Sequence, residues 1–332
     1  MKIRSKGILG LVLAGLSLAP AHAATFVPAL VFGGSKYDKG FNEMAFAGAE
    51  RFSKAYAARY LELQTMNDAQ KEQGLRAMAR RADMVVAVGI SFTPAVETVA
   101  REFPRVKFVM IDARARGDNV ESVLFREQEG AFLVGMAAAL KSRTHAVGFI
   151  GGMGLPLIRS FGCGYAQGAR HVDAKVRLIQ NMAADTQLGF SDPARGAELA
   201  RSQFERGADV IFSAANLTTL GVLQQARDSG KYAIGVDSNQ NGLYPGSVLT
   251  SMVKRVDNAV LASLKAGRDG SWRPGVRNLG LKEGGVDWAL DANNRPLIPG
   301  AMRQRIESAR ADIVAGRLTV ADYRRHNTCP VS

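Results

Sequence analysis

Two carboxylates stand at similar places in this sequence, each directly after an apolar run. Asp112 closes "KFVMID" and Asp237 closes "YAIGVD". Two facing carboxylates can work as general acid and general base, for example in cleaving a glycosidic bond. Two other interpretations stay open. Each Asp can cap the loop or helix that follows it, or both can accept hydrogen bonds from a neutral polar ligand.

The other reactive residues lack the spacing that catalysis or metal binding requires. The glycines at 33, 34 and 40 form neither GxxxxGK[ST] nor GxGxxG, so a phosphate-binding loop is not indicated. The three histidines after residue 25 have no second ligand at i+3 or i+4, which argues against a metal site. Cys163 in "FGCGY" has no histidine identified as its partner. We therefore expect a protein that is not an enzyme and that needs no metal or cofactor.

Aromatic, amide and basic residues follow the other apolar runs. They are Phe41, Asn42, Phe190, Asn216 and Lys254. Aromatic rings can stack on a planar ligand, and the polar groups can bind its hydroxyl or ring N–H groups. A neutral polar ligand therefore accounts for more of this set than an acid/base pair does. The simpler alternative is that Phe41 belongs to the core and Asn42 caps a helix.

The elements that must position these residues are short strands and amphipathic helices in alternation. Apolar runs that are buried on both faces are typical of parallel strands covered by helices, and ligands bind at the carboxyl ends of such strands. The runs are 26–32, 84–89, 107–112, 146–151, 209–214, 232–237 and 248–253, with a further strand near 176–181. The sequence predicts a doubly wound α/β fold.

The alternation runs in two passes, before and after about residue 145. The helix "EGAFLVGMAAALKSR" carries the chain between them, and "GSWRPG" at 270–275 interrupts the second pass. At 332 residues the chain is long enough for two cores. We predict one lobe from 24–144 plus about 254–279, and a second lobe from about 145–253 plus 280–332, with a cleft between them.

The N-terminus has the pattern of a secretory signal. Three basic residues precede the apolar run "GILGLVLAGLSLAP", and "AHA" at 21–23 is typical of a cleavage site. We predict a signal peptide over 1–23. The alternative, an uncleaved anchor, is disfavoured because the run is shorter than the roughly 20 residues of a membrane span. No cysteine follows Ala23 directly, so we expect a periplasmic protein without a lipid anchor.

Charge does not indicate a nucleic-acid partner. The formal charge of +13 falls to +10 without residues 1–23, and the basic residues stand singly or in pairs. A solvated basic surface is the better interpretation. The two cysteines, Cys163 and Cys329, either pair in an oxidising compartment or stay apart, and the sequence alone leaves both open.

Seven motifs together resemble the basic membrane protein (Bmp) family of ABC-transporter substrate-binding proteins, which includes a bacterial purine nucleoside receptor. The motifs, in order over residues 26–265, are "DKGFN", "MIDA", "VGFIGGM" with "PLIRSF", "GFSDPARG", "GADVIFSAA", "IGVDSNQ" and "LTSMVKRVDNAV". The resemblance implies the type I periplasmic binding fold, with two α/β lobes joined by three crossovers. It also implies a small-molecule ligand, an ABC permease as partner, and a monomer.

The resemblance assigns roles to the candidate residues. It implies that Phe41 and Phe190 enclose a nucleoside base, that Asp112 binds the polar edge of the base, and that Asp237 and Lys254 hold the ribose hydroxyls. Asn42 corresponds to an amide at the mouth of the first loop.

The chain also departs from the family pattern. "AANLTTLG" at 214–221 replaces a glycine-rich segment and brings Asn216 near the ribose end, so the ligand can differ from the usual one. Many members are lipoproteins, whereas this chain lacks the expected cysteine.

We therefore expect the substrate-binding component of an ABC importer, which binds a purine nucleoside or related nucleobase by closure of the cleft. The alternatives are a receptor of the same fold for a sugar or other small metabolite, a periplasmic nucleoside hydrolase using Asp112 and Asp237, and a signalling or adhesion protein that has lost transport.

Overall fold

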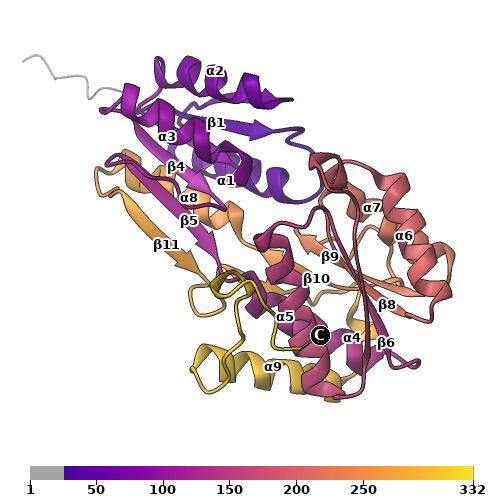
Figure 1. Ribbon diagram of the computed structural model, residues 1–332. Helices are drawn as coiled ribbons and strands as arrows, with labels where there is room; N and C mark the ends of the chain where they lie inside the picture. The colour runs from indigo at the N-terminus through magenta and orange to yellow at the C-terminus, as the bar shows by residue number, and fades with distance from the viewer. Residues whose placement is uncertain (1–25, 332) are drawn as a thin grey trace, which may run out of the picture.

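The computed structural model describes residues 26–331. The predicted signal peptide, 1–23, lies outside these residues. The described chain forms two six-stranded sheets, each covered by helices on both faces (Figure 1). The prediction of a doubly wound, two-lobed α/β fold is confirmed.

The first sheet is parallel throughout, with the strand order β11-β5-β4-β3-β1-β2. Its strands alternate side chains between two apolar layers: Leu30 and Phe32 face one, and Ala29 and Val31 the other. The strands are β1 (Pro28–Gly33), β2 (Leu61–Thr65), β3 (Met84–Val88), β4 (Lys107–Ile111), β5 (Val120–Phe125) and β11 (Gly275–Leu279).

The second sheet has the order β12-β10-β9-β8-β6-β7, and only β12 runs antiparallel to its neighbour. Its strands are β6 (Ala146–Gly151), β7 (Arg177–Met182), β8 (Val210–Ala214), β9 (Tyr232–Asp237), β10 (Val248–Lys254) and β12 (Val286–Trp288).

Paired helices cover each sheet. On the first sheet α1 and α8 pack on one face and α2 and α3 on the other; on the second sheet α4 and α5 pack on one face and α6 and α7 on the other, with α9 outside α4 (Figure 1). The helices are α1 (Phe41–Tyr56), α2 (Asp68–Ala79), α3 (Thr93–Glu102), α4 (Glu127–Lys141), α5 (Pro156–Val172), α6 (Pro193–Glu205), α7 (Leu217–Asp228), α8 (Val256–Arg268) and α9 (Gly300–Val314). Four short 3₁₀ turns are η1 (Ile90–Phe92), η2 (Gln187–Phe190), η3 (Arg295–Leu297) and η4 (Tyr323–Arg325).

The chain passes between the sheets after β5, after β10 and after β11. Helix α4 packs closely on α5 of the second sheet, and a Cβ at Gly168 would lie 1.9 Å from the carbonyl oxygen of Phe132. The predicted first lobe runs to residue 144 and so includes α4. The lobe boundaries stay a prediction.

The predicted strands are present, and the strands that the sequence did not predict are β2, β5, β11 and β12. Strand β5 contains Glu121, whose buried carboxylate accepts a 2.9 Å bond from Trp272 Nε1 and pairs with Arg277. Strands β2 and β11 lie at the edges of the first sheet and expose alternate residues. Their pattern lacks the apolar continuity of the inner strands.

Candidate functional site

A cavity of about 150 Å³ lies where the carboxyl ends of the two sheets' strands meet. All seven residues predicted from the sequence line it. They are Phe41, Asn42, Asp112, Phe190, Asn216, Asp237 and Lys254. The strand-end rule therefore brings together residues from six separate segments, Phe41 and Asn42 being neighbours. Their role in binding is not tested by this placement.

Two aromatic rings reach the cavity from opposite sheets. Phe41 is the first residue of α1, directly after β1 and its loop. Phe190 ends the short turn η2, and its ring lies on Gly152, where a Cβ would come within 2.4 Å of two ring carbons. Only glycine at position 152 allows the Phe190 ring to lie there.

Asn42 fixes the loop that precedes it. Its side-chain amide donates to the carbonyl oxygens of Gly33 at 3.2 Å and Ser35 at 3.0 Å. The N-terminal N–H groups of α1 are capped by another residue, since Asp38 accepts bonds from the backbone N–H groups of Gly40, Asn42 and Glu43.

A buried lysine stands at the centre of the site. Lys254 is 1% exposed, and its Nζ lies 2.6 Å from Asp112 and 3.2 Å from Glu127. Burial alone would lower the pKa of Lys254, but the carboxylates of Asp112, Glu127 and Asp237 outweigh it and raise that pKa. Lys254 is therefore protonated, and its ammonium group places hydrogen-bond donors at the cavity wall.

Asp237 has a different environment, although it is also buried, with 8% exposure. Burial raises the pKa of Asp237 to about 7; Lys254 opposes this shift, and the neighbouring carboxylates of Asp112, Asp38 and Glu127 add to it. Asp237 therefore changes protonation state near neutral pH.

Three strand-end residues adopt left-handed backbone conformations. Asp112, Asn216 and Asp237 have φ values of 76°, 51° and 64°. Positive φ is uncommon outside glycine, is best tolerated by Asn and Asp, and is concentrated at functional sites. All three line the cavity, so the local strain coincides with the candidate site.

Asn216 presents an unsatisfied acceptor. Its buried Oδ1 has no hydrogen-bond partner within residues 26–331. A Cβ at Gly40 would lie 3.6 Å from this oxygen and 3.8 Å from Oδ2 of Asp237. The amide therefore faces the loop after β1, beside Asp237. A buried acceptor without a partner is a natural place for a ligand donor.

Two side chains of the second lobe bond a main-chain carbonyl of the first lobe beside the cleft. The Lys39 carbonyl oxygen accepts bonds from Ser238 Oγ at 2.6 Å and from Gln240 Nε2 at 2.9 Å. These bonds join the loop after β1 to the loop after β9, so the structure has its two lobes in contact.

Several residues at or beside the site are not among those predicted from the sequence. Phe161 and Gln187 line the cavity, while Glu127 and Arg324 lie behind Lys254. Glu127 carried one signal, a carboxylate at the start of a helix that is otherwise almost wholly buried. Arg324 carried none, because it comes from the C-terminal segment, 70 positions after Lys254.

The two cysteines pair with each other in the structure. Cys163 on α5 and Cys329 near the C-terminus form a disulfide. Over residues 26–331 no cluster of three or more His, Cys, Asp or Glu side chains could hold a metal ion. No helix in the same range is long and apolar enough to span a membrane.

Comparison with known proteins gives a consistent picture. The family described as "ABC transporter substrate-binding protein PnrA-like" (Bmp) matches residues 26–317. An uncharacterized lipoprotein of Pyrococcus abyssi is 33% identical over 273 residues, covering 78% of this chain and 67% of its own. Basic membrane protein A of Borreliella afzelii is 29% identical, covering 86% of this chain and 88% of its own.

A solved structure shares the fold. The ABC transporter system solute-binding protein of Aeropyrum pernix K1 superposes with a TM-score of 0.82 at 26% identity, covering 91% of this chain and 95% of its own. The family and this structure are solute-binding proteins and not enzymes.

One expectation is corrected by these comparisons. Three Pyrococcus relatives are named lipoproteins, which contradicts the expectation of a periplasmic protein without a lipid anchor. That expectation was wrong. It rested on a few residues near Ala23, outside the described residues. A lipid is attached at a single position and leaves no mark on the core or the cleft, so the pattern of the folded domain carried no information about it.

Proposed function

The chain belongs to the Bmp family of ABC transporter substrate-binding proteins, and on that premise we propose that its ligand is a purine nucleoside or a related nucleobase. As a member of this family it is the substrate-binding component of an ABC transport system, with a small-molecule ligand and a transporter as partner. The nature of the ligand is the part that we propose.

The observation that carries the proposal is the composition of the cavity wall. Phe41 and Phe190 reach it from opposite sheets, together with Asp112, Asp237 and the ammonium of Lys254. Two aromatic rings suit a planar base, and charged donors and acceptors suit hydroxyls and ring N–H groups. An acid/base role for the two carboxylates has less support, since Asp112 is paired with Lys254 at 2.6 Å.

Each residue has a proposed role. The base lies between Phe41 and Phe190, and Asp112 binds its polar edge. Asp237 and Lys254 bind the ribose hydroxyls, with Asn216 beside them. Asn42 holds the first loop in the shape that presents Phe41.

These contacts are of the size that a receptor needs. Stacking contributes roughly 1–3 kcal/mol per ring, and hydrogen bonds to charged groups about 1.5–3 kcal/mol each. Two stacks and three such bonds are enough for the roughly −8 kcal/mol of a micromolar complex, after the cost of ordering.

Closure is the proposed mechanism. The ligand binds groups of both lobes at once, so it stabilises the arrangement in which the lobes touch over the arrangement in which they are apart. The bonds from Ser238 and Gln240 to the Lys39 carbonyl oxygen help to hold that arrangement.

Calorimetric titration tests the ligand class. We expect inosine, guanosine or adenosine to bind, and ribose and galactose to fail. At 100 times its dissociation constant a ligand should add about 2.7 kcal/mol of stability, visible as a rise in Tm. Binding of a sugar without binding of any purine compound would overturn the proposal and leave a receptor for another solute.

A further inference from the structure

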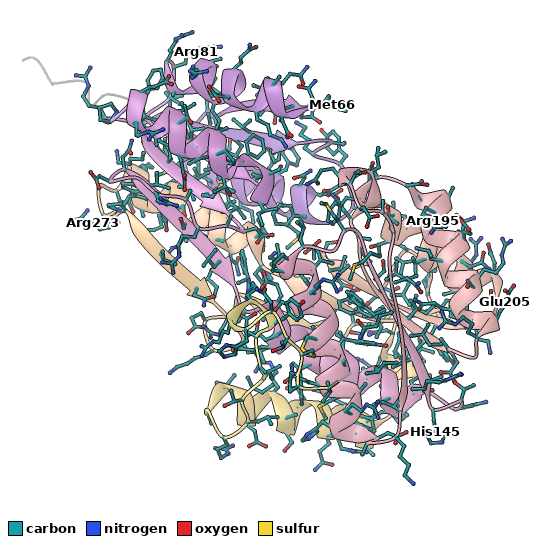
Figure 2. All side chains as sticks on the ribbon, viewed as in Figure 1. Met66, Arg81, His145, Arg195, Glu205 and Arg273 are labelled. Atoms are coloured by element: carbon teal, nitrogen blue, oxygen red, sulfur yellow. A yellow bond between two sulfur atoms is a disulfide. The ribbon has the colours of Figure 1, made fainter. Side chains whose placement is uncertain are left out.

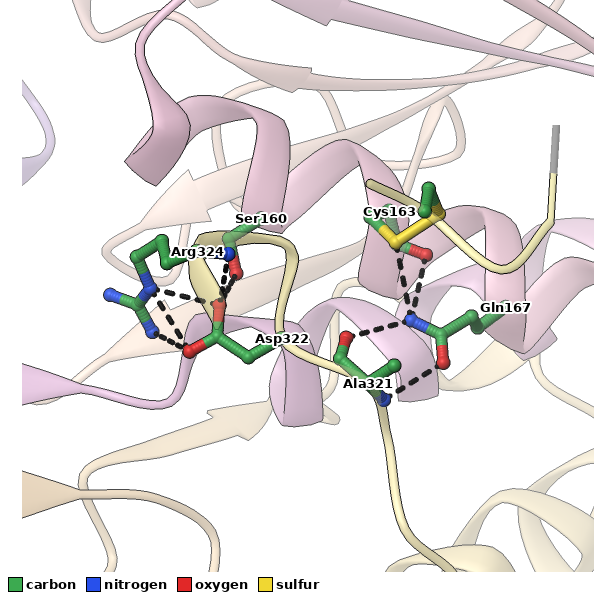
Figure 3. The surroundings of a disulfide bond; sticks show 7 residues. Ser160, Cys163, Gln167, Ala321, Asp322 and Arg324 are labelled. Carbon is green, nitrogen blue, oxygen red and sulfur yellow. Dashed lines mark hydrogen bonds and ion pairs between the residues drawn. A yellow bond between two sulfur atoms is a disulfide. The ribbon is translucent and has the colours of Figure 1, made fainter. Parts of the chain in front are cut away.

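The C-terminal segment, residues 318–331, returns from α9 and lies along α5. The Gln167 side chain on α5 bonds both main-chain groups of Ala321, each at 2.9 Å, and Ser160 Oγ donates to Asp322 at 3.0 Å. The Cys163–Cys329 disulfide closes the attachment further along (Figure 3). One face of α5 therefore holds this segment at three successive points.

This attachment directs one arginine inward. The Arg324 guanidinium is held by Asp322, with Nε 2.9 Å from Oδ1 (Figure 3), and by the carbonyl oxygen of Phe125, 2.9 Å from Nη2. Its Nη1 lies 3.0 Å from Oε2 of Glu127, whose side chain is fully buried.

Glu127 connects this arginine to the cavity. Its Oε2 faces Arg324, while its Oε1 lies 3.2 Å from Nζ of Lys254. Lys254 in turn contacts Asp112 at 2.6 Å and lines the cavity, whereas Glu127 and Arg324 do not line it. A continuous row of charges thus runs from the C-terminal segment to the ligand site.

Arg324 balances the negative charge of Glu127 in this row. Three carboxylates act on the ammonium of Lys254, namely Asp112, Glu127 and Asp237. With Arg324 in place, Glu127 is shared between two cations. Without Arg324, the buried carboxylate of Glu127 would have Lys254 as its one cation. Glu127 would then compete with Asp112 and Asp237 for the ammonium of Lys254. A buried charge that loses its partner is strongly unfavourable.

We propose that Arg324 is a positioning residue for the ligand site: it neutralises Glu127 so that Lys254 stays directed at Asp112 and the cavity, and the Cys163–Cys329 disulfide keeps Arg324 in place. The effect on ligand affinity rests on the proposed function, but the effect on the cavity's own charges does not.

The first test uses Arg324→Met, with Arg325→Met as the matched control because Arg325 is exposed. Inosine affinity should fall about tenfold in Arg324→Met, within the 5–150-fold range typical of coupling between sites, and stay unchanged in Arg325→Met. The double variant Glu127→Gln/Arg324→Met should recover most of the lost affinity, since it removes the carboxylate that needs the arginine. A double variant as weak as Arg324→Met would overturn the proposal.

The second test addresses the disulfide. Cys163→Ser/Cys329→Ser should weaken inosine binding in the same direction. Adding Arg324→Met should then cause less further loss than it does alone, because both changes act through Glu127. A disulfide variant with lower Tm and unchanged affinity would show that the bond only stabilises the fold, which overturns its proposed role.

The third test needs no ligand. The carboxyl ¹³C signal of Asp237 can be titrated in wild type and Arg324→Met. The charged groups that act on Asp237 are Lys254, Asp112, Asp38 and Glu127, and Arg324 acts on Glu127. The midpoint should rise in Arg324→Met and return in the double variant.

The titration separates two failures. If no purine compound binds wild type and the Asp237 midpoint still shifts, the proposed ligand is wrong and the positioning role stands. If inosine binds and neither its affinity nor the midpoint responds to Arg324→Met, the positioning role is wrong.

Discussion

On the first-sheet side of the cavity Asn42 and Asp112 are already bonded within the protein, whereas on the second-sheet side Asn216 keeps an unpaired oxygen and Asp237 lacks an ion pair, over residues 26–331. Asn42 donates to two main-chain carbonyl oxygens, and Asp112 pairs with Lys254. Opposite them, the Oδ1 of Asn216 has no partner, and Asp237 has no ion pair within residues 26–331. The first side is organised in advance, and the second side offers the groups that a ligand can complete.

The charges divide between the surface and the interior. The surface arginines are dispersed over the molecule, with Arg81, Arg195 and Arg273 at widely separated points of its outline (Figure 2). The paired charges around Lys254 are instead buried and close together. The basic composition therefore belongs mainly to the solvated surface, and the cavity owes its character to the few charges beside Lys254.

The largest effect should come from removing the cation that pairs with Asp112 of the first-sheet side. Lys254→Met leaves the carboxylates of Asp112 and Glu127 buried without this cation, which should cost about 3–5 kcal/mol of unfolding free energy, measured by urea denaturation at pH 7. Lys265→Met is the control, because its ion pair with Asp269 is exposed and screened by water, so its loss should change stability little. Equal small losses in both variants would contradict the comparison.

The next effect concerns the protonation of Asp237 on the second side. Because burial raises its pKa to about 7, the folded state holds this proton more tightly than the unfolded state does. Stability should therefore fall as pH rises from about 4 to about 7 and level off above. At about 1.4 kcal/mol per pKa unit, the upper bound is on the order of 4 kcal/mol.

Asp237→Asn should remove that fall. The variant should match wild type near pH 4 and exceed its stability at pH 8, as measured by urea denaturation at both values. Asp185→Asn serves as control, since Asp185 is exposed. If Asp237→Asn kept the wild-type slope, another group would be responsible for it.

A smaller effect is expected for the stacking ring of the second side. Phe190→Ala should weaken inosine binding by about 1–3 kcal/mol, measured by calorimetry. Leu188→Ala, two residues away and 70% exposed, should leave the affinity unchanged. Unchanged affinity in Phe190→Ala would contradict the proposed stacking of Phe190 on the ligand.

The smallest effect should come from Asn216→Gly. Glycine accepts the φ of 51°, and the side-chain oxygen has no partner to lose, so stability should fall by about 1 kcal/mol at most, through the bond between the Asn216 side chain and Asp38. Inosine affinity should drop by about 1 kcal/mol through one lost hydrogen bond. Asn327→Gly is the matched control, since Asn327 has a similar φ of 54° but is exposed. A loss of stability without a loss of affinity would show that Asn216 serves the fold.

The sequence predicted the inner strands and the strand-end residues for a physical reason. Strands such as Met84–Val88 are buried on both faces and are therefore recognisable in the sequence as apolar runs. In a parallel sheet, the residues that follow these strands lie together at one edge. The two-lobed fold was predicted on the same basis, whereas the family was predicted from the resemblance of seven motifs.

What the sequence did not predict depends on tertiary partners. Glu121 interrupts an apolar run and is stable there because Trp272 and Arg277 bind it from 151 and 156 residues away. Arg324 is brought to Glu127 by a segment whose disulfide joins positions 166 residues apart. No local pattern in the sequence predicts such long-range contacts.

The bridge at the mouth of the cleft has a practical consequence. Ser238 and Gln240 bond the main-chain carbonyl of Lys39, so the contact does not need the side chain at that position. Cys163 and Cys329 are bonded to one another, and residues 26–331 contain no free thiol. Lys39→Cys would therefore introduce a single labelling point directly at the junction of the lobes. A fluorophore attached there should report each opening and closing of the cleft, which would turn the protein into an optical sensor for its own ligand.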